Sequence, residues 1–148
     1  HTGARQSADF FAPAMARQIA AIEQGGMEPV IKAGNLDAER DLTDVRDTVR
    51  AYALLMEKGI PGTIYNVSSG VGRPMRLVLE ELARRSHVTV RIETDPTRLR
   101  PRDISLLVGN STRLREATGW TPVISFERML DDLLSYWRTA LPPRRSPS

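Results

Sequence analysis

Arginines in loops are the residues of this chain best suited to chemistry with an anion. Arg40 lies between a short apolar run and the start of an expected helix, and residues 98–103 read Arg-Leu-Arg-Pro-Arg-Asp. A guanidinium group donates paired hydrogen bonds that match the oxygens of a phosphate, and a nearby carboxylate such as that of Asp103 can accept from ribose hydroxyls. The two loops therefore indicate a site for a nucleotide or a sugar diphosphate, with a solvated basic surface as the alternative.

The residue types of the chain give little support for a metal site, a thiol centre or a catalytic triad. The chain has no cysteine, so disulfides and thiolate ligands are excluded, and only His1 and His87 could offer imidazole. Asp41, Asp44 and Asp47 are spaced by three residues. A helix start explains the last two, because Asp44 can cap it and Asp47 suits its first turn. We therefore expect no metal site and no catalytic triad.

A glycine turn at residues 70–72 could suggest a dinucleotide site. A β-rich run at 63–67 leads into Gly-Val-Gly, a helix and a second strand that ends near Glu93, roughly the arrangement of a dinucleotide-binding fingerprint. Met75 occupies the place of the third glycine. We therefore interpret the segment as a turn without a ligand.

The composition is that of one globular domain. The 148 residues are 41% hydrophobic and 26% charged, and no apolar run approaches the roughly 18 residues of a membrane span. The chain start lacks the zones of a signal peptide, so we expect a cytoplasmic location and no membrane contact. Although the formal net charge is +3, no motif supports nucleic-acid binding.

Hydrophobic periodicity predicts alternating helices and strands, which is the α/β class. The expected helices are residues 10–24, 43–58, 74–86, 111–118 and 126–141, and the expected strands are 29–33, 63–67, 88–92 and 106–108. The second helix is predicted to bury the face formed by Val45, Val49, Tyr52, Leu55 and Met56. So few strands indicate the later part of a larger fold.

Five ordered segments resemble motifs of the extended short-chain dehydrogenase/reductase family of NAD-dependent sugar-nucleotide epimerases, dehydratases and reductases. They are His-Thr-Gly-Ala-Arg-Gln at 1–6, the Arg-Asp loop and helix at 34–47, Tyr-Asn-Val-Ser-Ser-Gly at 65–70, Arg-Pro-Arg-Asp at 100–103 and Thr-Gly-Trp-Thr-Pro at 118–122. Within the family, the loop at 34–38 and the run at 106–109 are most similar to the GDP-mannose 4,6-dehydratase and GDP-4-keto-6-deoxymannose reductase pair.

The resemblance implies the carboxy-terminal, substrate-binding part of an extended short-chain dehydrogenase Rossmann-type fold, without the amino-terminal cofactor half. Residues 1–141 would form a sugar-nucleotide-binding domain and residues 142–148 a flexible tail. In such enzymes two loop arginines hold the diphosphate and an acidic residue binds the ribose, while the base rests against a helix start and a short strand. The residues implied here are Arg40, Arg100, Asp103, Phe11, Ile31 and Lys32.

The catalytic Tyr-x-x-x-Lys pair of the family is missing from this sequence. Four residues after Tyr52, Tyr65 and Tyr136 the chain has methionine, serine and alanine. We therefore expect no catalytic residue and no cofactor bound by this chain, with NAD(P) belonging to the parent enzyme.

The sequence thus predicts the nucleotide-sugar-binding substrate domain of an NAD(P)-dependent GDP-4-keto-6-deoxymannose reductase or GDP-mannose 4,6-dehydratase. The alternative is a truncated, non-catalytic module for nucleotide binding or self-assembly. A homo-oligomer is also expected, because a chain with few strands exposes sheet edges and apolar surface.

Overall fold

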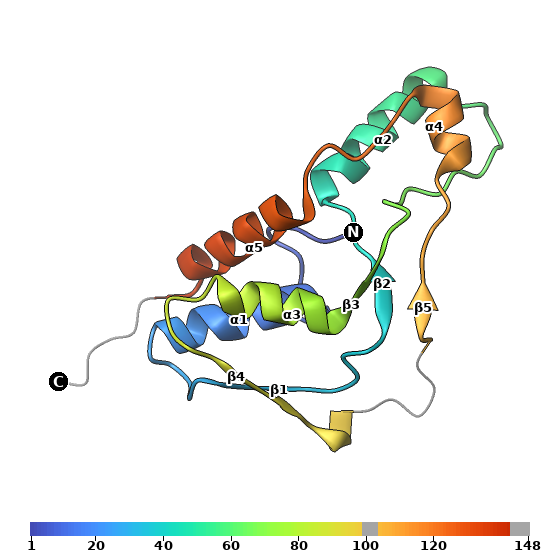
Figure 1. Cartoon of the computed structure of the whole chain (residues 1–148). Helices are drawn as coiled ribbons and strands as arrows, with labels where there is room; N and C mark the ends of the chain where they lie inside the picture. Colours follow the sequence, from blue (N-terminus) through green and yellow to red (C-terminus); the bar gives the residue numbers. More distant parts are fainter. Residues whose placement is uncertain (99–103, 143–148) are drawn as a thin grey trace.

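The computed structural model of the chain describes residues 1–98 and 104–142 (Figure 1). Helices alternate with short strands. In chain order the elements are α1 (Phe11–Glu23), β1 (Val30–Ala33), β2 (Glu39–Asp41), α2 (Val45–Lys58), β3 (Gly72–Pro74), α3 (Met75–Arg84), β4 (Arg91–Thr94), a 3-10 turn (Pro96–Arg98), β5 (Leu106–Leu107), α4 (Thr112–Thr118) and α5 (Phe126–Ala140). The predicted α/β class is confirmed, and the predicted helices agree with α1 to α5 within one or two residues at most of their ends.

Two small sheets connect the helices. β1 pairs in parallel with β4, and β2 lies between β3, which is antiparallel to it, and β5, which is parallel to it. The register places Arg40 of β2 directly opposite Arg73 of β3 and beside Leu107 of β5. Directly paired residues of neighbouring strands project from the same face, so these three side chains share one face of the sheet.

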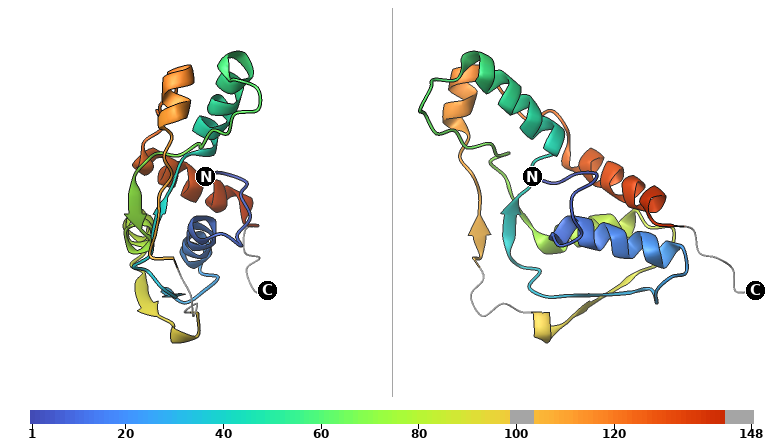
Figure 2. Two further views of the ribbon diagram at one scale, coloured as in Figure 1. Left: turned by 90° about the vertical axis from the view of Figure 1, so that its right-hand side faces the viewer. Right: turned by 180° about the vertical axis from the view of Figure 1, so that it is seen from behind.

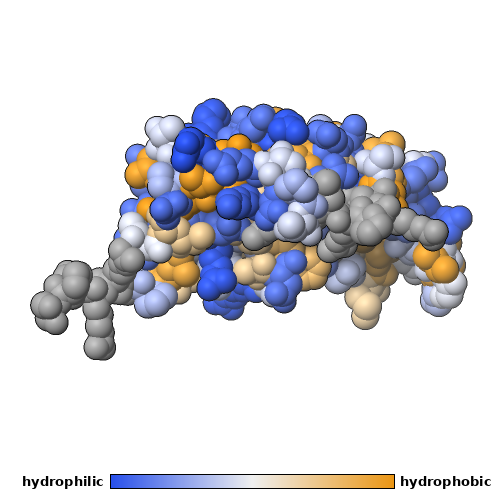
Figure 3. All heavy atoms as spheres, turned by 90° about the horizontal axis from the view of Figure 1, so that it is seen from below, coloured by the Kyte–Doolittle hydropathy of each residue, from blue (hydrophilic) through white to orange (hydrophobic). Residues whose placement is uncertain are grey.

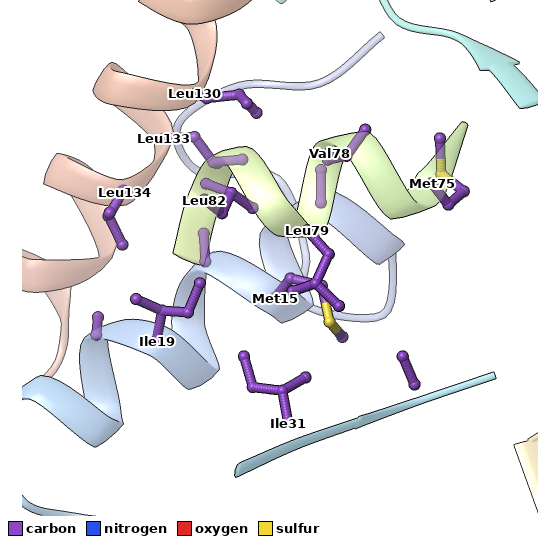
Figure 4. Packing of buried hydrophobic residues seen from close by; sticks show 14 of the residues in the cluster. Met15, Ile19, Ile31, Met75, Val78, Leu79, Leu82, Leu130, Leu133 and Leu134 are labelled. Atoms are coloured by element: carbon purple, nitrogen blue, oxygen red, sulfur yellow. The ribbon is translucent and has the colours of Figure 1, made fainter. Parts of the chain in front are cut away.

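The main core lies where α1, α3 and α5 pack together over β1 (Figure 4). Apolar residues at helical spacing supply it, as in α1, where Met15, Ile19 and Ile22 are buried. Ile31 of β1 closes the core from the strand side and has no exposed surface. The layer is therefore a self-contained hydrophobic unit that fixes the end of β1 against the start of α1.

A second, smaller core joins α2 to α4, and the left view of Figure 2 shows these two helices beside each other, apart from the three-helix layer. Its fully buried members are Ala51, Leu114 and Trp120, and Tyr65 and Val67 pack against them. The indole Nε1 of Trp120 donates to the carbonyl of Asp47 at 2.9 Å, which attaches the loop before α5 to α2.

The face predicted for α2 is wrong in part: Leu55 packs against the smaller core, but three of its other residues are exposed. Val49, Tyr52 and Met56 are 59%, 56% and 89% exposed, whereas the helix buries Asp47, Thr48 and Ala51. Asp47 can be buried because its carboxylate accepts the backbone N–H groups of Val123 and Ile124 and a guanidinium N–H of Arg50, as is expected of a buried charge.

The predicted strand at 63–67 is not formed among the described residues. The strand predicted at 88–92 begins later, at Arg91, and the three-residue strands β2 and β3 were not predicted. Such short strands are stabilised by partners distant in sequence, so no local alternation indicates them.

Within the described ranges, no helix combines the length and apolarity needed to cross a bilayer. Seen from below (Figure 3), the coloured atoms of the face near β1 and β4 mix hydrophilic and hydrophobic residues. That face therefore shows no single continuous apolar area.

Candidate nucleotide-binding cleft

A cleft of about 350 Å³ opens between the start of α1, the end of β1 and β2. Its walls combine aromatic, polar and cationic side chains: Asp9, Phe10, Phe11, Ala14, Met15, Lys32, Ala33, Gly34, Asn35, Ala38, Arg40 and Met75. The volume and the mixed lining are typical of a small-molecule site, in which apolar contacts supply affinity and a few polar groups fix orientation.

The start of α1 presents aromatic surface to this cleft. Phe10 is the N-cap residue of α1 and is 58% exposed, while Phe11 is half-buried in the first turn. Across from them, the alternation of β1 turns Ile31 into the core and leaves Lys32 exposed. An exposed aromatic ring opposite the end of a strand can support a planar base.

Arg40 stands at the other end of the cleft. One guanidinium nitrogen, Nη1, donates to the carbonyls of Glu39 at 2.8 Å and Ile104 at 2.7 Å. The second contact brings the guanidinium to the residue that follows the segment 99–103. The structure therefore places Arg40 at the boundary of the loop in which the sequence predicts two further ligands.

Asp41, the next residue of β2, fastens a loop rather than facing the cleft. Its carboxylate accepts from the backbone N–H groups of Ser69 at 2.9 Å, Gly70 at 2.8 Å and Gly109 at 3.3 Å, and from the Ser69 hydroxyl at 2.6 Å. Adjacent strand residues point to opposite faces of a sheet. Arg40 therefore faces the cleft, while Asp41 binds the loop at Ser69 and Gly70.

The same contacts bear on the glycine turn at 70–72. Gly70 has a φ of 81°, a backbone conformation that suits glycine, and its N–H is engaged by Asp41. The N–H groups of Ser69 and Gly70 thus already donate to the Asp41 carboxylate and are not available to a pyrophosphate. These residues do not fit a dinucleotide cofactor, in agreement with the interpretation of the segment as a turn.

Arg73 is a second cation on this face of the sheet, although it does not line the cleft. It lies opposite Arg40 on the β2–β3 pair, and its guanidinium carbon is 4.6 Å from the centre of the Phe126 ring. Within the described ranges no carboxylate forms an ion pair with it. Like charges directly opposite each other are unfavourable unless an anion compensates them. Only the pairing of two three-residue strands reveals this arrangement.

The predicted site residues divide into three groups. Phe11, Lys32 and Arg40 line the cleft together. Ile31 does not line it, because its side chain is fully buried in the core, and its predicted contact with a base does not fit that burial. Arg100 and Asp103 lie outside the described residues.

Several residues that line the cleft stand in no sequence motif that would identify them as site residues. Asp9, Asn35 and Met75 come from three separate segments that only the fold brings together. No group of His, Asp or Glu side chains in the part of the chain that the structure describes is arranged to hold a metal ion.

Comparison with known proteins identifies the family of this chain. The family model described as GDP-mannose 4,6 dehydratase matches residues 1–133. GDP-6-deoxy-D-mannose reductase of Pseudomonas aeruginosa is 36% identical over 139 residues, which cover 94% of this chain and 46% of the relative. The chain therefore spans about half the length of the curated relatives that it matches.

Solved structures agree with the sequence match. The structure of RMD from Pseudomonas aeruginosa complexed with NADPH has a TM-score of 0.89 at 35% identity, covering 95% of this chain and 46% of that one. UDP-glucose 4-epimerase from Thermotoga maritima with UDP-glucose has a TM-score of 0.74 at 26% identity, covering 95% and 44% of the two chains. The chain belongs to the GDP-mannose 4,6-dehydratase family of extended short-chain dehydrogenases/reductases and has the α/β fold of the carboxy-terminal part of these enzymes.

Proposed function

We propose that this chain binds the nucleotide diphosphate part of a GDP-linked sugar, as the substrate side of an NAD(P)-dependent reductase or dehydratase. The observation that carries the proposal is the cleft that brings Phe11, Lys32 and Arg40 together. The relatives support it: the similar Pseudomonas aeruginosa protein is a GDP-6-deoxy-D-mannose reductase, and the solved structure of RMD contains NADPH.

In this proposal the base lies between the aromatic start of α1 and the end of β1, and the diphosphate extends toward Arg40. Arg100 and Asp103 stay predicted ligands for the diphosphate and the ribose. A guanidinium gives the phosphates charge-assisted hydrogen bonds, and the binding energy holds the sugar where a reaction can occur. Because the sequence has no Tyr-x-x-x-Lys pair, the chain would contribute binding and orientation and leave hydride transfer to other residues of the enzyme.

Asp9 favours guanine as the base. Its carboxylate lines the cleft beside Phe10 and accepts a hydrogen bond from the Ser7 hydroxyl at 2.7 Å. An ionised carboxylate has free acceptor capacity for the neighbouring N–H groups on the edge of guanine, whereas uracil presents a single N–H.

Isothermal titration tests the proposal with GDP, GDP-mannose and UDP-glucose. The parent chain should prefer the two guanosine compounds. Arg40→Ala should raise the Kd for GDP about ten- to a hundredfold, because a hydrogen bond to a charged group contributes roughly 1.5–3 kcal/mol.

Arg91→Ala is the matched control, since Arg91 is exposed on β4, does not line the cleft and carries the same charge. Its Kd should equal that of the parent. If the parent binds none of the three compounds, the function is wrong. If GDP binds but Arg40→Ala binds it equally well, the site is wrong.

A further inference from the structure

A second hollow lies between the residues that follow β2, the loop that enters β3 and the start of α5. Its volume is about 310 Å³, and none of the residues that line it also lines the cleft. Its walls include Asp44, Val71, Arg73, Val123, Phe126 and Glu127. We call it the Arg73 hollow.

The guanidinium of Arg73 is held in place without an anionic partner. Its carbon lies 4.6 Å from the centre of the Phe126 ring, and that ring is fixed in the core with only 9% of the residue exposed. Among the described residues, the Arg73 side chain forms no ion pair and no hydrogen bond. A guanidinium stacked on a ring keeps the N–H groups at its edge free for paired hydrogen bonds to an oxyanion.

The charged groups around Arg73 leave its positive charge uncompensated. Asp44 lines the hollow, but both of its oxygens accept from the guanidinium of Arg46, at 2.9 Å and 2.8 Å. Glu127 is exposed to solvent in the first turn of α5, and no ion pair joins it to Arg73. Arg40, directly opposite on β2, adds a like charge. An anion bound by Arg73 would relieve this repulsion.

The hollow also offers apolar surface to a ligand. Val71 and Val123 line it, although they are 48% and 71% exposed. A site that combines apolar walls with one cation favours a molecule that has an apolar part as well as a charged group. A bare inorganic ion would use the arginine and leave the valines in water.

We infer that the Arg73 hollow binds a small organic anion. The carboxylate or phosphate group of that molecule accepts paired hydrogen bonds from Arg73, and its apolar part packs against Val71 and Val123. The inference is independent of the proposed function, because the hollow and the cleft have no lining residue in common.

An NMR titration of the chain tests the inference, because the Nε–H signal of Arg73 responds to the group that its guanidinium binds. The probes are phenyl phosphate and benzoate, which carry the two kinds of anionic group on one ring, and phenol, which has the ring without the charge. At least one anion should shift the signal in a saturable way, with a Kd of about 1–10 mM for a ligand of this size. The anion with the lower Kd identifies phosphate or carboxylate as the preferred group.

Arg73→Gln should raise the Kd of that anion at least about tenfold, because it removes the charged donor. Backbone amide signals of Val71 and Val123 report the binding in the variants. Arg91→Gln is the matched control, since it removes the same charge from the exposed strand β4, outside the hollow. Its Kd should equal that of the parent.

A second pair of variants leaves Arg73 and the core unchanged. The Val123 side chain is largely exposed, so Val123→Asp and its neutral counterpart Val123→Asn should both fold. The added carboxylate should raise the Kd at least about fivefold over that of Val123→Asn at low ionic strength, and salt should reduce the difference. This comparison decides the matter if Arg73→Gln does not fold.

Three results would overturn the inference. The first is the absence of saturable binding of either anion up to about 50 mM. The second is an equal Kd for Val123→Asp and Val123→Asn, or for the parent and a folded Arg73→Gln. The third is a set of shifts confined to cleft residues such as Phe11 and Ala33, which would assign the anion to the cleft. Titration with GDP, followed at the same cleft residues, tests the proposed function separately.

Discussion

At the scale of single residues, the carboxylates of Asp41 and Asp47 connect distant segments of the chain by accepting hydrogen bonds from their backbone N–H groups. Asp41 holds Ser69, Gly70 and Gly109 through backbone N–H groups, so it fixes the loops around the strand that carries Arg40. Asp47, in the first turn of α2, does the same for the backbone N–H groups of Val123 and Ile124. Removal of either carboxylate would leave several part-buried backbone donors without this acceptor.

Asp47 should make the stability of the fold depend on pH. Burial alone would raise the pKa of Asp47, but the hydrogen bonds from Arg50, Ile124 and Val123 outweigh it and hold the pKa below its ordinary value. A lowered pKa means that the stabilisation is complete above the pKa of the unfolded side chain, near 4, and is lost as the pH falls through the folded pKa.

We therefore predict that Asp47→Asn lowers stability at pH 7 and flattens the loss of stability between about pH 5 and pH 2. Urea denaturation at a series of pH values measures both effects. Asp37→Asn is the control, because the Asp37 side chain is 83% exposed and should shift stability by no more than about 0.5 kcal/mol. Parallel pH curves for the parent and Asp47→Asn would contradict the prediction.

At the scale of elements, the loop at 68–70 and the residues after β5 are packed without space for an extra methyl group. A Cβ atom added at Gly109 would lie 2.5 Å from the Cβ and 2.6 Å from the Oγ of Ser68. Ser68 itself is buried and receives a hydrogen bond from the Ser111 hydroxyl to its carbonyl. Neither loop can move away without disturbing the contacts of Asp41.

Gly109→Ala should therefore destabilise the chain by about 1–3 kcal/mol, the usual cost of overpacking. Ser68→Gly removes the atoms in the way, so in the double variant part of the loss should be recovered. Thermal unfolding of the parent, both single variants and the double variant gives the coupling free energy. Additive losses would show that the contact between the two loops is not the cause.

Local patterns predicted the helices well and the long-range contacts poorly. α1 and α5 are amphipathic segments with clear ends, so periodicity was sufficient to find them. The face predicted for α2 was wrong in part because Val49, Tyr52 and Met56 face outward, while Asp47 is buried through partners 76 and 77 residues further along the chain. For the strand predicted at 63–67, the described residues supply no neighbouring strand.

The cleft was predicted only in part, because local patterns mark some of its residues and long-range contacts bring in the others. Arg40 and Lys32 stand next to recognisable strand ends, and the resemblance to a family gave them a role. The position of Arg73 opposite Arg40, outside the cleft lining, could not be predicted, because it depends on the register of two three-residue strands. Ile31 is buried because its face of β1 meets the helices. The four residues of β1 alone do not indicate which of the two faces of the strand is turned toward the core.

At the scale of the whole molecule, the two cores differ greatly in size. The main core unites α1, α3, α5 and β1, whereas the core between α2 and α4 has three fully buried members. Resistance to local opening follows the amount of buried apolar contact. The part around α2 and α4 should therefore open at a lower free-energy cost than the main core.

Hydrogen exchange followed by mass spectrometry should show this difference. We predict that backbone amides in the middle of α2 exchange at least tenfold faster than those in the middle of α1 and α5. Equal protection of α1 and α2 in the chain alone would contradict the prediction.

The short connection between β2 and α2 has a consequence for ligand affinity. Only residues 42–44 separate the strand that carries Arg40 from α2, and Thr2 pairs with Asp44 at that junction. A partner that orders α2 would thus also restrict the motion of Arg40, and a nucleotide held by Arg40 would restrict α2. The two binding events would be thermodynamically coupled, so whatever factor the partner adds to nucleotide affinity, the nucleotide must return to the affinity for the partner.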